Sequence, residues 1–174
     1  QALLASRSAL STPKSPATAP AVTLATVIDE YCAEKAQTTW TPKTAEENQA
    51  IFSLLLAITS DVPVTAIDGA FARHVKQTLM KLPPNMNKNP LYRGKSIDEV
   101  LALNPPVTLS VTTINKYLHR IASLFEWACR HSFTSVNPFS SLGLKKPKRA
   151  HEERDPFTDD DLRKLFSSEI YTSK

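Results

Sequence analysis

The side chains of this sequence that could act chemically are mostly cations, and they fall into two groups. The first group lies along residues 110–131 and consists of Lys116, His119, Arg120 and Arg130. The second group follows in a segment interrupted by proline and consists of Lys145, Lys146, Lys148 and Arg149. Lys and Arg neutralise nucleic-acid phosphates, and this electrostatic term supplies much of the affinity of DNA-binding proteins. The pattern therefore indicates a nucleic-acid-facing surface, with an ordinary solvated surface as the alternative.

The distribution of charge along the chain favours the same interpretation. The formal net charge is +4 over 174 residues. Residues 1–70 carry 4 Lys and Arg against 7 Asp and Glu, a net charge of −3. Residues 71–154 carry 14 against 5, a net charge of +9, and residues 155–174 carry 3 against 5, a net charge of −2. A basic middle between acidic ends is typical of a chain that presents one surface to a polyanion.

Other kinds of chemistry lack the residues that they need. The sequence has only 3 glycines, all isolated, so it can form neither a P-loop nor a dinucleotide-binding fingerprint. Cys32 and Cys129 lie far apart and have no metal-ligand spacing, and His119 has no second ligand at i+4. We therefore expect no metal, no cofactor and no catalytic residue. Because no apolar run approaches the ~20 residues of a membrane helix, we also expect a soluble, cytoplasmic protein with no membrane partner.

A long helix is needed to position the first cationic group. Over residues 110–131 the apolar side chains recur at helical spacing and fall in one arc, namely Ile114, Tyr117, Leu118, Ile121, Leu124, Phe125 and Ala128. The opposite arc is polar and mostly cationic, and Glu126 is its one acidic member. A helix with one packed face and one cationic face can lie along a DNA major groove. The alternative is a solvated surface helix. Ile121 and Phe125 lie in the middle of the apolar arc, so we expect both to be nearly fully buried.

Further helical patterns precede this segment. We predict helices from Thr23, from near Thr41 to Asp61 and over Asp68–Lys81, with a short helix capped by Ser96-Ile97-Asp98-Glu99. Pro42 suits the first turn of the second helix, and Lys43 and Thr44 there are additional candidate DNA contacts. No stretch alternates polar and apolar residues with turn signals at both ends. The sequence therefore predicts an all-α fold, a bundle of four main helices plus a short helix.

Several short motifs follow one another in order after residue 110. They are Thr113-Ile114-Asn115-Lys116-Tyr117-Leu118, Phe125-Glu126-Trp127-Ala128, Asn137-Pro138, the basic stretch Lys145–Arg154 and Pro156-Phe157-Thr158. This order resembles the tyrosine recombinase, or phage integrase, family. In that family a helix of the form T-x-N-x-Y-L…F-x-W-A leads through Asn-Pro and a basic linker into the capped first helix of the catalytic domain. The resemblance is tight over residues 110–166, whereas over residues 23–82 only the order and spacing of helices match.

The resemblance implies a SAM-like core-binding domain, a helical bundle that forms half of a C-shaped clamp on double-stranded DNA. The family cleaves DNA with a tyrosine nucleophile, two arginines, a lysine and histidines, all in the catalytic domain. This sequence ends 17 residues after Phe157, before the first catalytic arginine is expected, and its 4 tyrosines match no nucleophile motif. We therefore expect an inactive, monomeric DNA-binding fragment. Its parent protein would be a recombinase that meets other protomers in a synaptic complex for integration or excision.

The same reasoning divides the chain into four parts. We predict a flexible N-terminal tether over residues 1–21, which are rich in Ala, Ser, Thr and Pro, and a core-binding domain over residues 22–143. A basic interdomain linker over residues 144–154 and the truncated start of a catalytic domain over residues 155–174 would follow. The chain begins with Gln1 rather than Met, which indicates a piece of a longer protein.

Two alternative interpretations stay open at this point. A helical protein–protein interaction module could use the same basic face to bind an acidic partner, although such a module has no reason to end in the opening helix of a second domain. Trp40 and Trp127 could stack on bases, but packing in the core or at its edge is the favoured interpretation for both.

Overall fold

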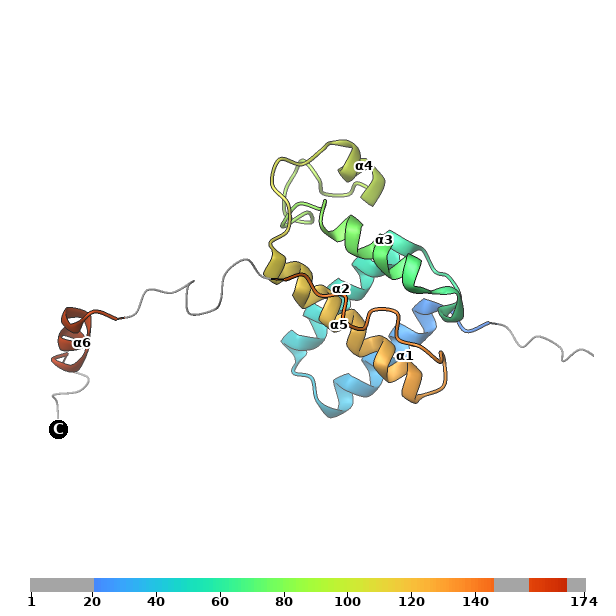
Figure 1. The fold of residues 1–174 in the computed structure, drawn as a ribbon, viewed down its shortest axis with the longest axis horizontal. Helices are drawn as coiled ribbons and strands as arrows, with labels where there is room; N and C mark the ends of the chain where they lie inside the picture. The colour runs from blue at the N-terminus through green and yellow to red at the C-terminus, as the bar shows by residue number, and fades with distance from the viewer. Residues whose placement is uncertain (1–20, 146–156, 169–174) are drawn as a thin grey trace, which may run out of the picture. The chain divides into compact units, whose positions relative to one another are not determined.

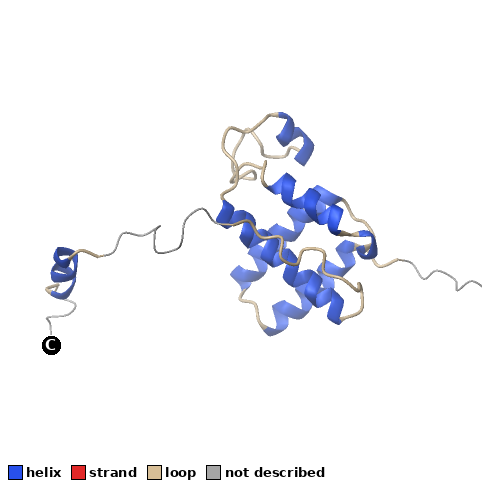
Figure 2. Ribbon diagram, viewed as in Figure 1, coloured by secondary structure: helices blue, strands red, loops and turns tan. Residues whose placement is uncertain are grey.

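The computed structural model describes residues 21–145 and 157–168, and its helices are the only regular elements in these ranges (Figures 1 and 2). They are α1 (Leu24–Thr38), α2 (Pro42–Thr59), the 3-10 helix η1 (Val64–Ala66), α3 (Gly69–Leu79), α4 (Ile97–Ala102), α5 (Val111–Arg130) and α6 (Asp159–Phe166). One isolated bridge pairs Thr23 with Pro63, and no strand is present in the described ranges. The predicted all-α class is thereby confirmed.

The chain separates into two compact units. Unit 1 combines the residues up to Val75 with Ile121–Ser140, and unit 2 combines Lys76–Arg120 with the residues from Ser141 onward. Both α3 and α5 therefore contribute residues to each unit. The sequence had indicated one bundle over residues 22–143 with boundaries at 144 and 155, and that division stays a prediction.

Aromatic side chains form the centre of unit 1. The Tyr31 ring of α1 has its centroid 5.3 Å from Trp40, 5.8 Å from Phe52 and 5.5 Å from Trp127, at steep angles. Edge-to-face and tilted arrangements place the positive edge of one ring against the negative face of another. Among the described residues, 17 of the 23 buried apolar side chains belong to unit 1. Unit 1 thus holds most of the buried apolar surface.

Local capping sets where the first two helices begin. Thr23 accepts a hydrogen bond from the Thr26 backbone N–H, and Thr41 accepts one from Thr44, with Pro42 in the first turn of α2. These side chains satisfy backbone donors that have no partner within the helix. The predicted start of the second helix near Thr41 is confirmed. At its other end the Ser60 backbone turns to a φ of 60°, and the chain leaves the helix.

The segment after α5 returns onto unit 1 through Asn137 and Phe139. The Asn137 side chain donates to the Ala122 carbonyl at 2.9 Å and accepts from the Phe139 backbone N–H at 3.0 Å. The Phe139 ring then lies 5.0 Å from the Phe125 ring, and Phe139 is buried. Ile121 and Phe125 are 2% and 1% exposed, so their predicted burial is confirmed.

Unit 2 relies on turns and caps around a smaller set of buried side chains. Its buried apolar residues are Leu79, Leu82, Tyr92, Val100, Ile114 and Leu118. The predicted capping box of α4 is confirmed, because the Glu99 N–H donates to Ser96 Oγ at 3.3 Å and the Ser96 N–H donates to the Glu99 carboxylate at 2.7 Å. The Leu109 N–H donates to the Leu82 carbonyl at 2.8 Å and so closes the intervening loop.

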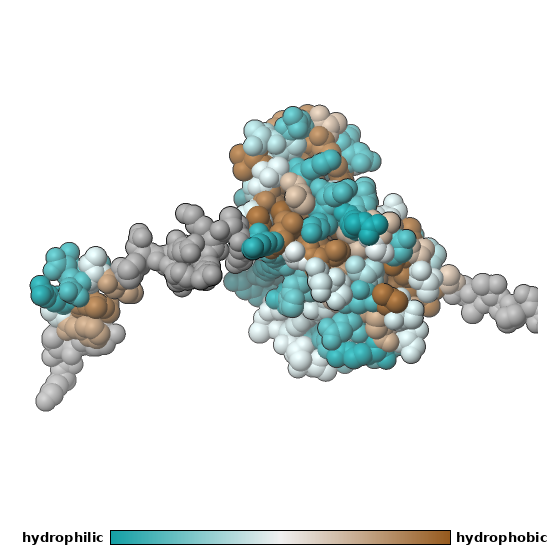
Figure 3. All heavy atoms as spheres, in the orientation of Figure 1, coloured by the Kyte–Doolittle hydropathy of each residue, from teal (hydrophilic) through white to brown (hydrophobic). Residues whose placement is uncertain are grey.

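The helix α6 has no buried residue in the described structure. A capping box between Thr158 and Asp161 starts it, and its charged and apolar side chains lie on opposite sides (Figure 3). Phe157 and Phe166 are 73% and 59% exposed. A capped helix at this place agrees with the sequence pattern that begins at Pro156-Phe157-Thr158.

Candidate nucleic-acid interface

The first half of α5 presents the cations that the sequence singles out. Ser110 caps this helix, since its hydroxyl accepts from the Thr113 N–H at 3.2 Å. Ile114 and Leu118 then fall on the buried face, 3% and 2% exposed. Positions three and four residues apart share a helix face, so Lys116 lies beside His119 and Arg120 on the outer side. Lys116 and His119 are exposed and Arg120 is half-buried, as expected for a residue at the edge of the polar arc.

Charge on this half of α5 is of one sign. Residues 111–120 contain Lys116 and Arg120 and no acidic residue. Glu126 is exposed on the later turns of the helix, which belong to unit 1. The two positive charges and the lack of negative charge within residues 111–120 therefore favour an anionic ligand at the outer face of this half of α5.

A pair of hydrogen bonds joins this half of α5 to the start of the connector. The Asn115 Nδ2 donates to the Leu144 carbonyl at 2.8 Å, and the Leu144 N–H donates to Asn115 Oδ1 at 2.7 Å. A Cβ added at Gly143 would lie 3.6 Å from Asn115 Oδ1, an ordinary contact. The next residue, Lys145, is exposed. The Asn115–Leu144 pair thus holds the chain just before Lys145 against the first half of α5.

Sequence reasoning did not assign a role to Asn115. It occurs within the motif Thr113–Leu118, but its type alone does not show which backbone groups it meets. The signal that could have found it is a polar residue at the border between the two arcs of an amphipathic helix. Such a residue often turns toward the main chain rather than toward solvent, because most side-chain hydrogen bonds go to backbone groups or to water.

The remaining candidate residues belong to unit 1 or fall outside the described residues. Lys43 is exposed in the first turn of α2, while the Thr44 hydroxyl lies 2.9 Å from that of Thr41 and belongs to the helix cap. Arg130 is exposed in the last turn of α5. These three lie in unit 1, and each is described within that unit alone. Lys146, Lys148 and Arg149 fall outside the described residues.

Both tryptophans pack within unit 1, as favoured from the sequence. Trp127 is 3% exposed and donates its Nε1–H to Glu34 at 2.8 Å. That hydrogen bond is the main cause that holds the pKa of the Glu34 carboxyl below its usual range. The His131 ring stacks on Trp127 with centroids 4.1 Å apart. Trp127 is therefore a core residue and offers no open ring to a base.

Metal binding and cysteine chemistry are two further possibilities that the described residues can address. No group of three or more His, Cys, Asp or Glu side chains is placed to hold a metal ion there. Cys32 and Cys129 are both free thiols, each half-buried. Burial, with a smaller effect from Asp29, raises the pKa of Cys32 to about 11, so its thiol is protonated at neutral pH and is a poor nucleophile.

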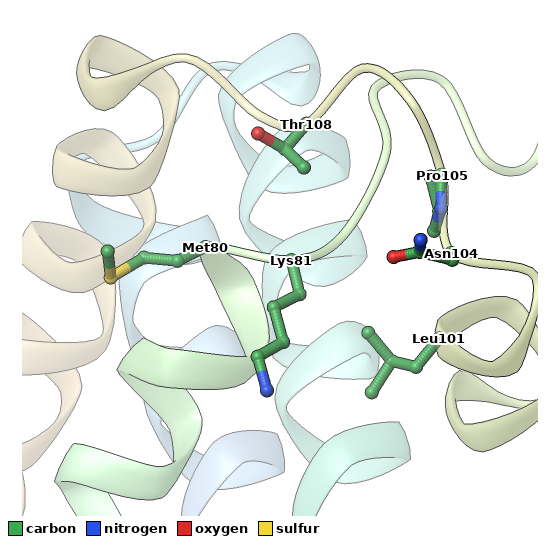
Figure 4. Close-up of a pocket in the computed structure, with 6 residues that line it drawn as sticks. All are labelled: Met80, Lys81, Leu101, Asn104, Pro105 and Thr108. Atoms are coloured by element: carbon green, nitrogen blue, oxygen red, sulfur yellow. The ribbon is translucent and has the colours of Figure 1, made fainter.

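One pocket lies within unit 2. Its volume is about 360 Å³, and Figure 4 shows the residues that line it, Met80, Lys81, Leu101, Asn104, Pro105 and Thr108. Lys81 is its one titratable group, and most of the lining is exposed to solvent. The pocket carries a single charge and its lining is half polar, whereas ligand sites are usually lined mostly by apolar side chains.

Comparison with known proteins does not assign the chain to a family. No protein family, curated protein or solved structure matches the chain. Among the helices that the structure describes, none combines the length and apolar character needed to cross a membrane.

Proposed function

We propose that this chain is a DNA-binding domain of a tyrosine recombinase and that it contacts duplex DNA through the first half of α5 and the adjoining connector. The observation that carries the proposal is the pairing of two features in unit 2. Lys116, His119 and Arg120 share the outer side of α5, and Asn115 on the same turns fixes the chain just before Lys145.

The two groups of cations would have different tasks on DNA. A cationic helix face can enter the major groove, where Lys or Arg donates to O6 and N7 of guanine. Cations that contact phosphates instead position the protein on the duplex and carry little sequence information. The exposed side of α5 fits the first task, while Lys145 and the basic residues after it fit the second. Lys43, Thr44 and Arg130 of unit 1 are separate candidate DNA contacts.

The family resemblance supplies the rest of the proposal. It supports a SAM-like bundle, a cytoplasmic parent protein that performs strand transfer, and contact with further protomers when the parent assembles on its DNA. Under this proposal the present chain contributes DNA binding and leaves the chemistry to residues of another domain.

The test is duplex binding by the full 174-residue chain, measured by fluorescence anisotropy over a series of salt concentrations that begins low. Replacing Lys145 and Lys146 by Gln should weaken binding to all duplexes alike. The slope of log K against log salt should fall by about 0.9 for each phosphate that the variant no longer neutralises. Arg120→Ala should instead reduce the difference in affinity between a duplex selected from a random pool and a duplex of unrelated sequence.

A matched control is available on α6. Arg163 and Lys164 are two exposed cations outside the proposed interface, so R163Q/K164Q lowers the net charge by the same amount as K145Q/K146Q. An unchanged salt slope for K145Q/K146Q would remove the connector from the interface. If the wild-type chain shows no salt-sensitive duplex binding even at low salt, the DNA proposal fails and a module for an acidic protein partner becomes the better explanation.

A further inference from the structure

A long stretch of the chain, from the start of α3 to the first residue of α4, carries positive charge without any negative charge. From residue 69 to residue 97 the sequence has no Asp or Glu. Over the same stretch it has six Lys and Arg residues, namely Arg73, Lys76, Lys81, Lys88, Arg93 and Lys95. Five of the six lie in unit 2. No motif of the recombinase resemblance falls in this stretch, and the proposed interface on α5 does not use it.

Consecutive hydrogen-bonded turns make the second half of this stretch compact. The Lys88 and Asn89 backbone N–H groups donate to the Asn85 carbonyl at 2.9 and 3.0 Å. The Arg93 N–H then donates to the Asn89 carbonyl at 2.9 Å, and the Lys95 N–H donates to the Tyr92 carbonyl at 3.2 Å. The segment is therefore ordered by its own backbone.

Tyr92 is the buried residue of these turns, whereas their cations are exposed. Tyr92 is 7% exposed, whereas Lys88, Arg93 and Lys95 are all exposed. Gly94 has a φ of 78°, which side-chain-bearing residues adopt at a cost, and it allows the tight turn between Arg93 and Lys95. Three cations are thus held on one short, ordered segment, which we call the cationic turn (Lys88, Arg93 and Lys95).

The chemistry of the cationic turn fits a phosphate backbone better than a protein surface. The centres of protein interfaces are enriched in aromatic residues and depleted of Lys, whereas the exposed residues here are mainly Lys, Arg and Asn. Exposed Asn85, Asn87 and Asn89 accompany the three cations. Lys, Arg and Asn side chains all donate hydrogen bonds to phosphate oxygens, and such contacts position a protein on DNA without reading its sequence.

We propose that the cationic turn is a second phosphate-binding surface, which contacts the backbone of duplex DNA regardless of sequence. The inference rests on the proposed function, because the ligand is the same duplex. It goes further in assigning phosphate contacts to a segment that lies between α3 and α4 and is separate in sequence from both α5 and the connector.

The experiment uses the full chain and a fluorescein-labelled duplex of random sequence, with anisotropy recorded at several salt concentrations. K88Q/R93Q should lower the slope of log K against log salt by about 0.9 for each phosphate no longer neutralised, and by the same amount for duplexes of unrelated sequence. The control R163Q/K164Q removes one Arg and one Lys from exposed positions of α6 and should leave the slope unchanged. The charge-retaining variant K88R/R93K should keep the wild-type slope.

The outcomes separate the failure of this inference from that of the proposed function. If K116A/R120A lowers affinity but K88Q/R93Q leaves the slope at its wild-type value, the second surface is overturned and the α5 interface stands. If K88Q/R93Q also lowers the thermal midpoint, Lys95→Gln alone should reduce the slope by about 0.9 with the midpoint retained. Binding of poly-glutamate as tight as that of the duplex, with the same response to K88Q/R93Q, would overturn the assignment to phosphate.

Discussion

Unit 1 and unit 2 are stabilised in different ways. In unit 1 the helices α1 and α2 meet the second half of α5 through rings that cluster around Tyr31, and the buried apolar side chains are concentrated there. In unit 2 the segment from Leu82 to Leu109 is shaped by turns, a capping box and one closing backbone hydrogen bond.

The difference bears on where each unit can interact. Unit 1 uses its aromatic and many of its polar groups internally, as the bond from Trp127 to Glu34 illustrates. Unit 2 buries few side chains in its own core and leaves Lys88, Arg93 and Lys95 exposed on ordered turns. We therefore expect substitutions in the core of unit 1 to change stability and substitutions of the exposed cations of unit 2 to change binding.

The largest expected effect is the loss of packing in unit 1. Phe125 is 1% exposed and its ring lies 5.0 Å from Phe139. Phe125→Ala should lower the free energy of unfolding by roughly 3–5 kcal/mol, since the removed ring leaves a cavity. A urea titration followed by tryptophan fluorescence measures it. A loss below about 1 kcal/mol would show that the second half of α5 is packed differently from the structure.

A gain in stability is expected at Asn48 of α2. This residue is 1% exposed, and neither atom of its amide has a hydrogen-bond partner in the described structure. A buried polar group without a partner costs about 1–3 kcal/mol, so Asn48→Leu, of similar volume, should raise the free energy of unfolding by roughly 1–2 kcal/mol. The same titration is the measurement. A decrease in the free energy of unfolding would mean that the Asn48 amide makes a polar contact whose stabilisation exceeds the cost of burying the amide.

Replacing one glycine in each unit by alanine should change stability by smaller amounts, and in different directions. Gly94 in unit 2 has a φ of 78°, so Gly94→Ala should cost roughly 1 kcal/mol even though the added Cβ meets nothing within 4 Å. Gly69 begins α3 in unit 1, and its added Cβ would lie 3.5 Å from Arg73 Nη1, an ordinary contact. Gly69→Ala should leave stability unchanged or raise it by about 0.5 kcal/mol. Thermal unfolding measures both variants, and equal shifts of the midpoint for Gly94→Ala and Gly69→Ala would contradict this expected difference.

The smallest expected effect is on the pH dependence of stability. It compares Glu34, whose hydrogen bond joins two distant parts of the chain, with Glu99, whose hydrogen bond is local to a helix cap. The Trp127 N–H lowers the pKa of Glu34, and the Ser96 backbone N–H lowers the pKa of Glu99, each from a usual value of 4.5. A lowered pKa gives stability that is present above the usual value and is lost as the pH falls through the folded-state value.

Unfolding titrations between about pH 6 and pH 3 check this expectation. Glu34→Gln and Glu99→Gln should each reduce the acid sensitivity of stability, because each removes one such carboxyl. Protonation of Glu34 should also change the tryptophan emission of the folded protein, because the Glu34 carboxylate accepts from the Trp127 Nε1–H. A tryptophan response that survives over the same pH range in Glu34→Gln would contradict this expectation.

The sequence contained enough information for most of the helices. Their apolar spacing and their caps act between residues at most four apart, so Thr41, Ser96 and Thr158 mark the starts of α2, α4 and α6 without knowledge of the fold. One difference lies at α3, predicted over Asp68–Lys81 and found over Gly69–Leu79. Asp68 serves there as the cap, since its carboxylate accepts from the Phe71 N–H at 2.8 Å.

The candidate site was partly within reach of the sequence. The exposure of Lys116 and His119 and the edge position of Arg120 follow from the helical phase of a single amphipathic helix. The ordered turns that carry Lys88 and Arg93 could not be predicted from the sequence. A segment rich in Asn and Pro has the pattern of a loop whether or not its turns are hydrogen-bonded. Whether these cations meet DNA stays a prediction.

Local sequence thus determined the helix positions and the faces that they bury, because period and capping are properties of neighbouring residues. Tertiary structure alone decided the contacts between residues far apart in the chain. Asn115 meets Leu144 across 29 positions, and Trp127 meets Glu34 across 93. Such partners are chosen by how whole helices pack, and many pairings satisfy the same local pattern. The physical reason is that burial favours any apolar face equally, whereas a hydrogen bond favours only the one partner at the right distance and angle.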